Sequence, residues 1–477
     1  MSKLKSNFIY NAVYQVLVLI IPFVTMPYIS RTIGVAGVGT YSFTYSIVCY
    51  FMMFALLGMN NYGNREVAKN KSNREKLDKT FSSIYFFQII TTIIVFLVYL
   101  IYIFLFYKQY FMINCIQSLY ILSVAFDINW FFCGLQEFKI TITRSGIIRI
   151  VTLLLIFMFV KRPSDLWKYI AILSSMTLLN QLVLWPFLKG KVRFVKVNFR
   201  EIKRHIKPTF ILFIPVLAVS MYKIMDKIMI GGITSISEVA YYENAEKMIN
   251  VVMQIVLALG TVTLPEMTHL FNMQKLNEYN RILYKSMSIV SFIVFPAIFG
   301  LLATSKDLVS VYLGNDFLNT YKVLNILSLS LIFTSLASII RMQLLIPQHR
   351  DKEYTISVVC GAAINFVLNI LLISKFRSSG AAIATLISEF FVFTLQYYYS
   401  RKDIQIKKVL KESSYFFIVS IIMYIIVMII GMFISNIITK LIVQITVGSA
   451  IYFLMNISFI KENINFFNRR KKYEKKD

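Results

Sequence analysis

Residues 413–439 read SSYFFIVSIIMYIIVMIIGMFISNIIT and contain no charged side chain. A helix needs about 20 apolar residues to cross a bilayer, and charge-free runs of this kind recur at residues 6–30, 80–107 and 354–374. The whole chain of 477 residues is 57% hydrophobic and only 15% charged. This is more apolar surface than a soluble core can bury. The sequence therefore predicts an all-α integral membrane protein.

Charge-free runs and turn signals together predict about fourteen transmembrane helices. Their edges are defined by charged residues and by Gly or Pro. The predicted spans are residues 7–29, 40–58, 81–106, 111–133, 145–160, 168–188, 208–230, 240–263, 283–304, 320–346, 355–374, 381–400, 413–435 and 441–460.

The distribution of Lys and Arg predicts the orientation of these spans. Cytoplasmic loops of membrane proteins carry an excess of basic residues. With both termini placed in the cytoplasm, the predicted cytoplasmic segments contain 34 of the 50 Lys and Arg residues and the external segments contain 8. The first span follows Lys3 and Lys5 without a small-residue cleavage site, which indicates an uncleaved span. We expect a multi-pass protein of the bacterial cytoplasmic membrane.

The most basic connection, residues 189–207, divides six predicted spans from eight. Proline-bent spans, glycine turns and Leu-Gly pairs recur weakly on its two sides. These features predict two pseudo-symmetric six-helix lobes around a central cavity, residues 1–200 and 201–405. The remaining region, residues 406–477, contains spans 13 and 14 and a basic cytoplasmic tail. Internal repeats with broken helices are typical of transporters that expose a central site to each side in turn.

Several basic residues lie inside predicted spans, where a charge is costly and usually functional. Lys223 and Lys227 are spaced i,i+4 on one helix and therefore share a face. With Arg31 they suggest a cationic wall for a phosphate or pyrophosphate group, to which such side chains donate charge-assisted hydrogen bonds. Side chains near span ends can instead extend to the interface. The predicted substrate-binding set is Arg31, Lys223, Lys227, Lys247, Arg149 and Arg341.

Acidic residues at depth are fewer than basic ones. Each could carry a coupling proton or could pair with a base, and Glu243 is spaced i,i+4 from Lys247. The candidates are Asp127, Asp226, Glu243, Glu246 and Glu389.

Motifs for other kinds of chemistry are missing from the sequence. No GxxxxGK[ST] phosphate loop is present, which argues against an ATP site in this chain. The three histidines fall in predicted cytoplasmic connections, and the four cysteines lie in apolar runs without paired spacing. The net charge of +27 is concentrated in short loops and the tail, where anionic lipid headgroups balance it. We expect no cofactor, metal site or nucleic-acid partner.

An ordered set of residues between about 7 and 400 gives the chain a family resemblance. It consists of Asn11, Pro22, Pro27-Tyr28-Ile29-Ser30-Arg31, Gly34, Gly37, Gly39-Thr40-Tyr41-Ser42, Tyr50-Phe51, Leu57-Gly58, Tyr62-Gly63, Arg65-Glu66, Trp130-Phe131-Phe132, Gly134, Glu137-Phe138-Lys139, Arg144, Arg149, Asp226-Lys227, Gly231, Ala240-Tyr241-Tyr242, Ala245-Glu246-Lys247, Pro265, Asn365, Asn369, Gly380-Ala381-Ala382 and Glu389. In this set the chain resembles the polysaccharide flippases (Wzx-type), whose superfamily also contains the multidrug and toxic-compound extrusion transporters.

The resemblance implies a transporter rather than an enzyme. Its expected substrate is a polyprenyl-pyrophosphate-linked oligosaccharide, such as a capsule or O-antigen-like repeat unit, moved from the cytoplasmic to the outer leaflet by alternating access. A polysaccharide polymerase and glycosyltransferases are the expected partners. The alternatives are a lipid II flippase or a multidrug antiporter of the same fold and, more remotely, a membrane glycan polymerase or transferase. The longest predicted external segment, residues 305–319, is short for such an enzyme.

Overall fold

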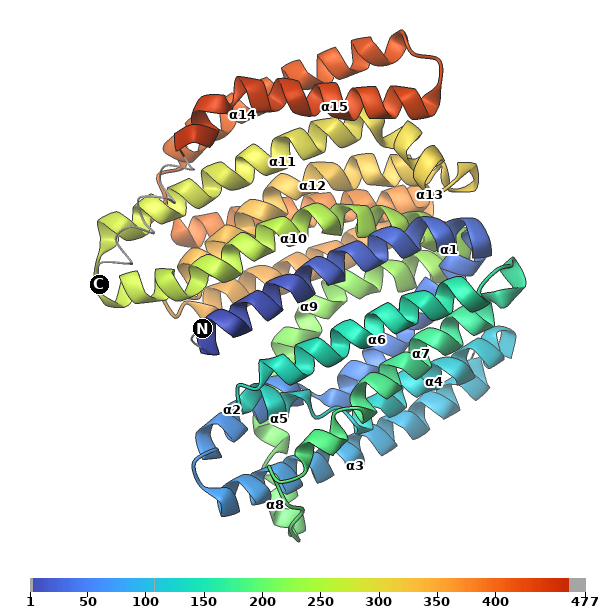
Figure 1. The fold of residues 1–477 in the computed structure, drawn as a ribbon, viewed down its shortest axis with the longest axis vertical. Helices are drawn as coiled ribbons and strands as arrows, with labels where there is room; N and C mark the ends of the chain where they lie inside the picture. Colours follow the sequence, from blue (N-terminus) through green and yellow to red (C-terminus); the bar gives the residue numbers. More distant parts are fainter. Residues whose placement is uncertain (1–2, 107, 463–477) are drawn as a thin grey trace. The chain divides into compact units, whose positions relative to one another are not determined.

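The computed structural model describes residues 3–106 and 108–462, and within them it leaves out the side chains of residues 3–20, 215, 218, 219, 222, 223 and 406. Lys223 and the tail from residue 463 onward therefore lie outside the described part. The described residues form helices and no strand (Figure 1). The predicted all-α class is confirmed.

Fifteen α-helices and one π-helix follow one another along the described chain. The first nine are α1 (Lys3–Leu56), α2 (Met59–Asn70), α3 (Arg74–Phe106), α4 (Phe111–Ala125), α5 (Asn129–Gly134), α6 (Phe138–Phe159), α7 (Leu166–Leu182), α8 (Phe199–Lys203) and α9 (Ile206–Ile233). The others are α10 (Ile236–Asn272), α11 (Leu276–Tyr312), α12 (Thr320–Ile340), the π-helix η5 (Arg341–Leu345), α13 (Asp351–Ser400), α14 (Ile406–Met432) and α15 (Ile437–Met455).

Among the described residues, eleven segments are long and apolar enough to cross a membrane. Helices α1 and α13, which contribute to two of these segments, each have one non-helical residue inside them, Gly34 with φ 70° and Arg377 with φ 53°. Each of these two helices therefore covers two predicted spans. Helix α9 coincides with the predicted span 208–230. The prediction of about fourteen transmembrane helices is confirmed.

Local differences from the predicted spans have clear causes. The predicted span 111–133 is two helices, α4 and α5, because the chain turns at residues 126–128 and Asp127 accepts a hydrogen bond from the backbone N–H of Asn129 at 2.9 Å. Helix α6 begins at Phe138, seven residues before the predicted start at residue 145. Helices α2 and α8 lie in predicted connections, since neither contains an apolar run long enough to span.

By internal packing the chain divides into two compact units. Unit 1 comprises residues 1–243 and 366–378, and unit 2 comprises residues 244–365 and 379–477. Helices α10 and α13 thus contribute to both units. The predicted lobes, with boundaries at residues 200 and 405, stay a prediction.

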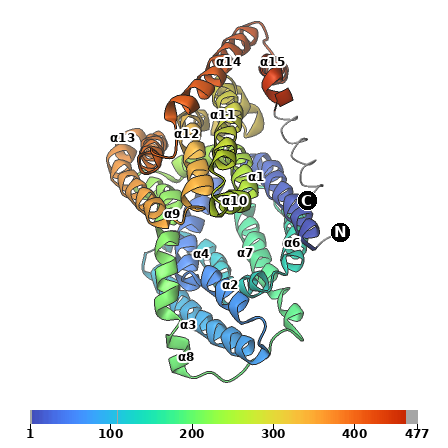
Figure 2. The same cartoon turned by 90° about the vertical axis from the view of Figure 1, so that its left-hand side faces the viewer.

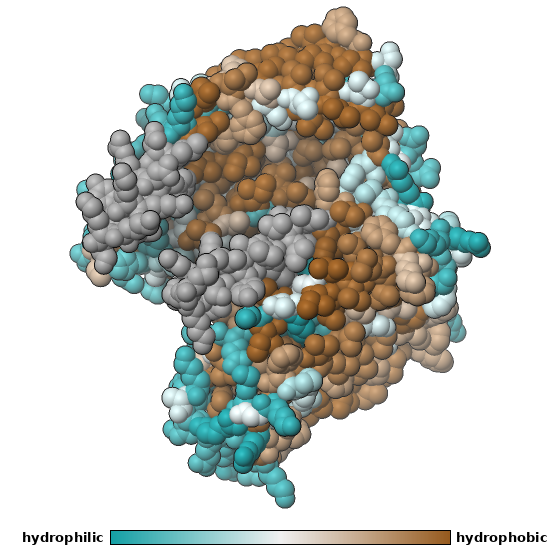
Figure 3. Space-filling model, viewed as in Figure 1, coloured by the Kyte–Doolittle hydropathy of each residue, from teal (hydrophilic) through white to brown (hydrophobic). Residues whose placement is uncertain are grey.

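In unit 1, an aromatic core ties α2, α3 and α5 together. Trp130, Phe131 and Phe81 are almost fully buried, and the rings of Phe81 and Phe131 lie 4.9 Å apart edge to face. Hydrophilic side chains gather around α2, the start of α3 and α8, while apolar side chains cover the helices beyond them (Figure 3). This pattern is the one expected for helices whose middle parts face lipid.

The basic connection at residues 189–207 binds along the start of α3. The backbone N–H of Arg193 donates to Asp78 at 2.9 Å, that of Val195 donates to Ser82 at 3.0 Å, and Lys79 pairs with Glu201. Next to it, the ring of His205 is 1% exposed and is hydrogen-bonded by Tyr62 and Ser83. The connection is therefore a docked part of unit 1.

Unit 2 is organised around α11, which packs against α12, α14 and α15 (Figure 1, Figure 2). The side chain of Gln343 in η5 donates to Thr263 of α10 at 2.7 Å and to Ser286 of α11 at 2.8 Å. The hydroxyl of Tyr452 in α15 donates to the carbonyl of Phe292 at 2.8 Å. These bonds fix α10, η5 and α15 against α11.

Candidate functional site

A group of charged and polar side chains lies where α9, the start of α10 and the middle of α13 meet inside unit 1. We call it the charged cluster. Its members are Asp226, Lys227, Tyr242, Glu243 and Asn369. Because α9 and α10 are joined by a short turn after Ile233, residues 226–227 and 242–243 lie at matching depths on antiparallel helices.

Lys227 and Glu243 form an ion pair across the two helices. The Nζ of Lys227 lies 2.9 Å from the Oε2 of Glu243, and the two side chains are 14% and 12% exposed. A charge at membrane depth is costly unless a partner compensates it. Glu243 therefore gives Lys227 a counter-charge.

Asp226 connects three helices, α9, α10 and α13. Its carboxylate accepts hydrogen bonds from the hydroxyl of Tyr242 and from the amide of Asn369, the latter at 2.6 Å, and the residue is 1% exposed. Carboxylate acceptors make stronger hydrogen bonds than neutral ones. Asp226 thus holds α10 and α13 against α9.

Two glycines allow α1 to approach this region closely. A Cβ on Gly231 would lie 2.2 Å from the ring of Phe43, and one on Gly39 would lie 2.0 Å from the carbonyl oxygen of Ile236. Neither distance is compatible with a side chain. Tyrosines follow on the same part of α1, with Tyr41 stacked on Tyr45 at 5.4 Å between ring centroids.

A second buried polar group of unit 1 surrounds Arg144 of α6, and we call it the arginine network. The guanidinium of Arg144 donates to Asn129 Oδ1 at 2.9 Å and to the backbone carbonyl of Asn180. The amide of Asn129 donates to Asp127 at 2.8 Å and to Gln181 at 3.0 Å. The network joins α5, α6 and α7, and Arg144 is 6% exposed.

Other predicted residues lie on α1, α6, α10 and α13, and two of them, Glu246 and Lys247, are about one helical turn after Glu243. In unit 1, Arg31 is exposed on α1 and Arg149 is half-buried on α6. In unit 2, Glu246 and Lys247 are half-buried on α10, and Glu389 is buried on α13. Of the predicted set, the structure brings Asp226, Lys227 and Glu243 together. It places Asp127 in the arginine network.

Arg341 is the first residue of the π-helix η5. Its guanidinium lies over the ring of Tyr354 at 5.6 Å and donates to the hydroxyl of Ser338 at 3.3 Å. Single π-helical turns are frequent at functional sites because they redirect side chains. The cation–π contact orients Arg341 within unit 2.

The sequence assigned no role to two members of the charged cluster. Tyr242 and Asn369 are among the residues that carry the family resemblance. This resemblance was the one indication in the sequence that they belong to the site. Their function in binding Asp226 depends on contacts between helices, which spacing within one helix cannot reveal. Among the described residues, no group of three or more His, Cys, Asp or Glu is placed to bind a metal ion.

Comparison with known proteins gives a consistent result. Residues 4–271 match the model of the family described as polysaccharide biosynthesis protein. A candidate O-antigen transporter of Escherichia coli K12 is 24% identical over 405 residues, which is 84% of this chain and 97% of that protein.

Solved structures with the same fold are known. The chain is similar to a lipid II flippase in an inward closed conformation, with a TM-score of 0.76 and 18% identity over 96% of this chain and 99% of the other. It is also similar to an inward-facing multidrug resistance transporter of the MATE family and MOP superfamily, with a TM-score of 0.57 and 11% identity over 82% of this chain and 99% of the other. These similarities establish the fold.

Proposed function

Because this chain belongs to the polysaccharide biosynthesis protein family, we propose that it is a flippase for a polyprenyl-pyrophosphate-linked oligosaccharide. It moves the sugar headgroup from the cytoplasmic to the outer leaflet by alternating access. The glycan is a repeat unit of a cell-surface polysaccharide, such as a capsule or an O-antigen-like chain.

The observation that carries this proposal is the alignment with a candidate O-antigen transporter, because it covers nearly all of that protein and most of this chain. A match of this extent includes the membrane helices and the connections between them, and not a single shared motif. The flippase fold agrees with the same activity. A transporter of this type needs no catalytic group, and we propose none.

Within this function, Lys227 supports binding of the pyrophosphate. A pyrophosphate and the carboxylate of Glu243 are both oxyanions and can compete for one ammonium group. Without substrate, Glu243 would neutralise the charge of Lys227. With substrate bound, Lys227 would pair with the pyrophosphate instead. Lys223 and Arg31 complete the proposed pyrophosphate site, while Lys247, Arg149 and Arg341 line the path.

The acids have proposed roles as ion-pair partners or proton carriers. Glu243 pairs with Lys227, which favours the first role for it, while Asp226 is bound by the neutral groups of Tyr242 and Asn369. Glu246 and Glu389 stay candidates for coupling. We place the protein in the bacterial cytoplasmic membrane with both termini inside, where glycosyltransferases build the substrate and a polymerase uses the product.

A complementation experiment tests the proposal. A strain that lacks its own O-antigen flippase is given this chain, and surface glycan is measured together with the amount of protein in the membrane. We expect surface glycan to return with the wild type. Failure in hosts that make several different repeat units, with normal membrane levels, would contradict it.

A lipid II flippase is the second candidate, supported by the TM-score of 0.76 to a protein of that function. Rescue of cells depleted of their lipid II flippase separates the two candidates. We expect no rescue, because the family match points to polysaccharide repeat units.

A further inference from the structure

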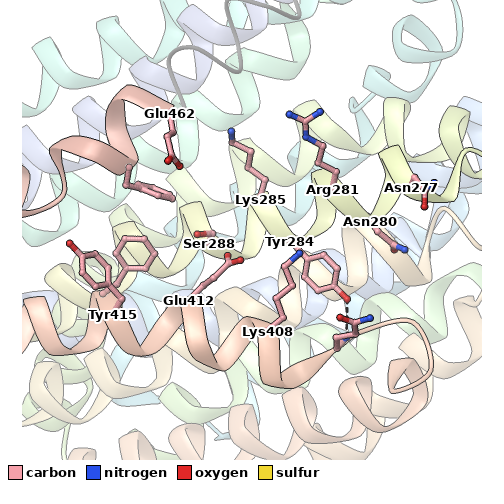
Figure 4. A pocket seen from close by; sticks show the side chains of 13 residues that line it. Asn277, Asn280, Arg281, Tyr284, Lys285, Ser288, Lys408, Glu412, Tyr415 and Glu462 are labelled. Atoms are coloured by element: carbon pink, nitrogen blue, oxygen red, sulfur yellow. Dashed lines mark hydrogen bonds between the residues drawn. The ribbon is translucent and has the colours of Figure 1, made fainter.

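Unit 2 contains a second basic site, which is separate along the chain from every residue of the charged cluster. A pocket of about 720 Å³ lies between the start of α11, the start of α14 and the residues that follow α15 (Figure 4). Its charged lining is Arg281, Lys285, Lys408, Glu412 and Glu462, with bases in excess. The positive-inside pattern of the sequence puts this end of α11 on the cytoplasmic side.

Aromatic and amide groups shape the pocket. The Nζ of Lys408 lies 4.5 Å from the ring centroid of Tyr284, and the Tyr284 hydroxyl accepts a hydrogen bond from the backbone N–H of Gln405 at 2.9 Å. Two side-chain amides, Asn277 and Asn280, also line it. In Figure 4 the side chains of Lys285 and Glu462 point toward one another across the opening. The cation–π contact holds Lys408 at the pocket in a defined position.

An apolar groove lies next to this pocket along α11. The groove, of about 340 Å³, is lined by Phe292, Pro296, Val427 and Tyr452 among other residues. The ring of Phe292 lies 5.8 Å from Phe416 and 5.2 Å from Phe459, and both of these rings line the basic pocket. Phe292 is one helical turn, about 6 Å, beyond Ser288 in the pocket. A polar pocket and an apolar groove thus lie next to each other, at the end of α11 that the positive-inside pattern puts near the cytoplasmic surface.

From this arrangement we propose that the pocket binds the phosphate headgroup of an anionic glycerophospholipid of the cytoplasmic leaflet. Bases, amide donors and an ordered lysine match a phosphate oxyanion, and the groove accepts an acyl chain of the same molecule. Such a lipid stabilises the packing of α14 against α11. The proposal does not depend on the transport function, since it concerns residues outside the pyrophosphate site.

The test measures lipid binding to the purified full-length protein in detergent by native mass spectrometry. The probes are phosphatidylglycerol, phosphatidylcholine with the same chains, undecaprenyl phosphate and inorganic phosphate. We expect saturable binding of phosphatidylglycerol, weaker binding of phosphatidylcholine, and an affinity about tenfold lower in the double variant K285Q/K408Q, which loses two charged donors.

Two further variants keep the test decisive. Lys407→Gln removes one positive charge, as Lys408→Gln alone does, but from a neighbouring residue of α14 that is exposed and does not line the pocket, so it should leave the affinity unchanged. Glu412→Gln removes a repelling carboxylate and should raise the affinity, an outcome that misfolding cannot produce.

Three results would overturn the proposal. The first is an equal loss of affinity in Lys407→Gln and in the double variant, which indicates a diffuse surface effect. The second is displacement of the lipid by inorganic phosphate at equal concentration. The third is a preference of tenfold or more for undecaprenyl phosphate, which assigns the pocket to the polyprenyl carrier.

Discussion

Lys227 and Arg144 are both basic side chains buried among the helices of unit 1, but their partners differ in kind. Lys227 faces the carboxylate of Glu243, an oxyanion like a phosphate. Arg144 donates to the amide oxygen of Asn129 and the backbone carbonyl of Asn180, which are neutral groups built into the fold, and Asp127 joins this network through a hydrogen bond from Asn129. An incoming anion can replace a carboxylate at a lysine. It cannot easily replace several acceptors that are built into the fold around a planar guanidinium.

We therefore expect the charge of Lys227 to be available to the substrate and the charge of Arg144 to stabilise the fold. Within the charged cluster, the ion pair of Lys227 and Glu243 is the place where we expect a substitution to affect transport more than stability. The arginine network is the place where we expect the reverse. Each of the following experiments can break or sharpen this contrast.

The largest effect is expected from the charged cluster. Lys227→Ala should reduce glycan export at least about tenfold, because one charge-assisted contact to the pyrophosphate is lost, while Lys227→Arg should retain part of the export. Export is measured per unit of protein in the membrane. The control is the double variant K227A/E243Q, which removes the carboxylate charge together with the lysine charge. If that double variant exports at the wild-type level, Lys227 serves only as a counter-charge.

The second effect concerns stability. Arg144→Met should lower the free energy of unfolding by about 3 kcal/mol, since several buried acceptors lose their donor, and it should leave export per folded molecule close to normal. Thermal unfolding in detergent measures the first quantity. Lys139→Met, at an exposed position of the same helix, is the matched control. An Arg144→Met protein that is stable but does not export glycan would show that Arg144, like Lys227, acts in transport. This result would contradict the contrast between the two residues.

His205, a third buried side chain of unit 1, should make the stability of the protein depend on pH. Its pKa is lowered to about 4, because burial disfavours the charged ring and Arg204 repels it. The unfolded chain takes up the proton near pH 6.5 and the folded one near pH 4, so stability should fall by up to about 3 kcal/mol as the pH drops between these values. Unfolding measured from about pH 7.5 to about pH 4.5 checks this. His205→Gln should flatten the dependence, and the exposed His269→Gln should not.

The smallest effect is expected at Asp226. Tyr242→Phe removes one of its hydrogen bonds and should cost about 1 kcal/mol of stability, with export per molecule unchanged. Asp226→Asn should cost more, because it replaces a charged acceptor that binds two donors. A loss of export in Asp226→Asn together with wild-type stability would instead assign Asp226 to coupling.

The contrast also shows what the sequence could predict. Charge-free runs such as residues 413–439 located the membrane helices, since lipid imposes a length and an apolar composition that the sequence displays directly. The breaks at Gly34 and Arg377 fall in the predicted connections 30–39 and 375–380. The positive φ of Arg377 was not expected, because arginine rarely takes one. Helix α2 was missed because a short polar helix leaves no apolar run.

The site was less predictable than the fold. Spacing within one helix identified Lys227 as a base at depth and Glu243 as a neighbour of Lys247. It could not show that α9 and α10 bring Glu243 to Lys227, or that Tyr242 and Asn369 meet at Asp226. His205 was expected in a connection, and it lies there, but its burial between Tyr62 and Ser83 depends on packing between distant segments.

The most direct test of Lys227 as a transport residue uses the purified protein. The wild type and Lys227→Ala are placed in liposomes with a fluorescent polyprenyl-pyrophosphate oligosaccharide, and the fraction of headgroups that becomes accessible on the opposite leaflet is measured over time. We predict rapid movement with the wild type and movement close to the protein-free rate with Lys227→Ala. Equal movement by both proteins, or none by the wild type across several repeat units, would contradict a flippase that binds its substrate through Lys227.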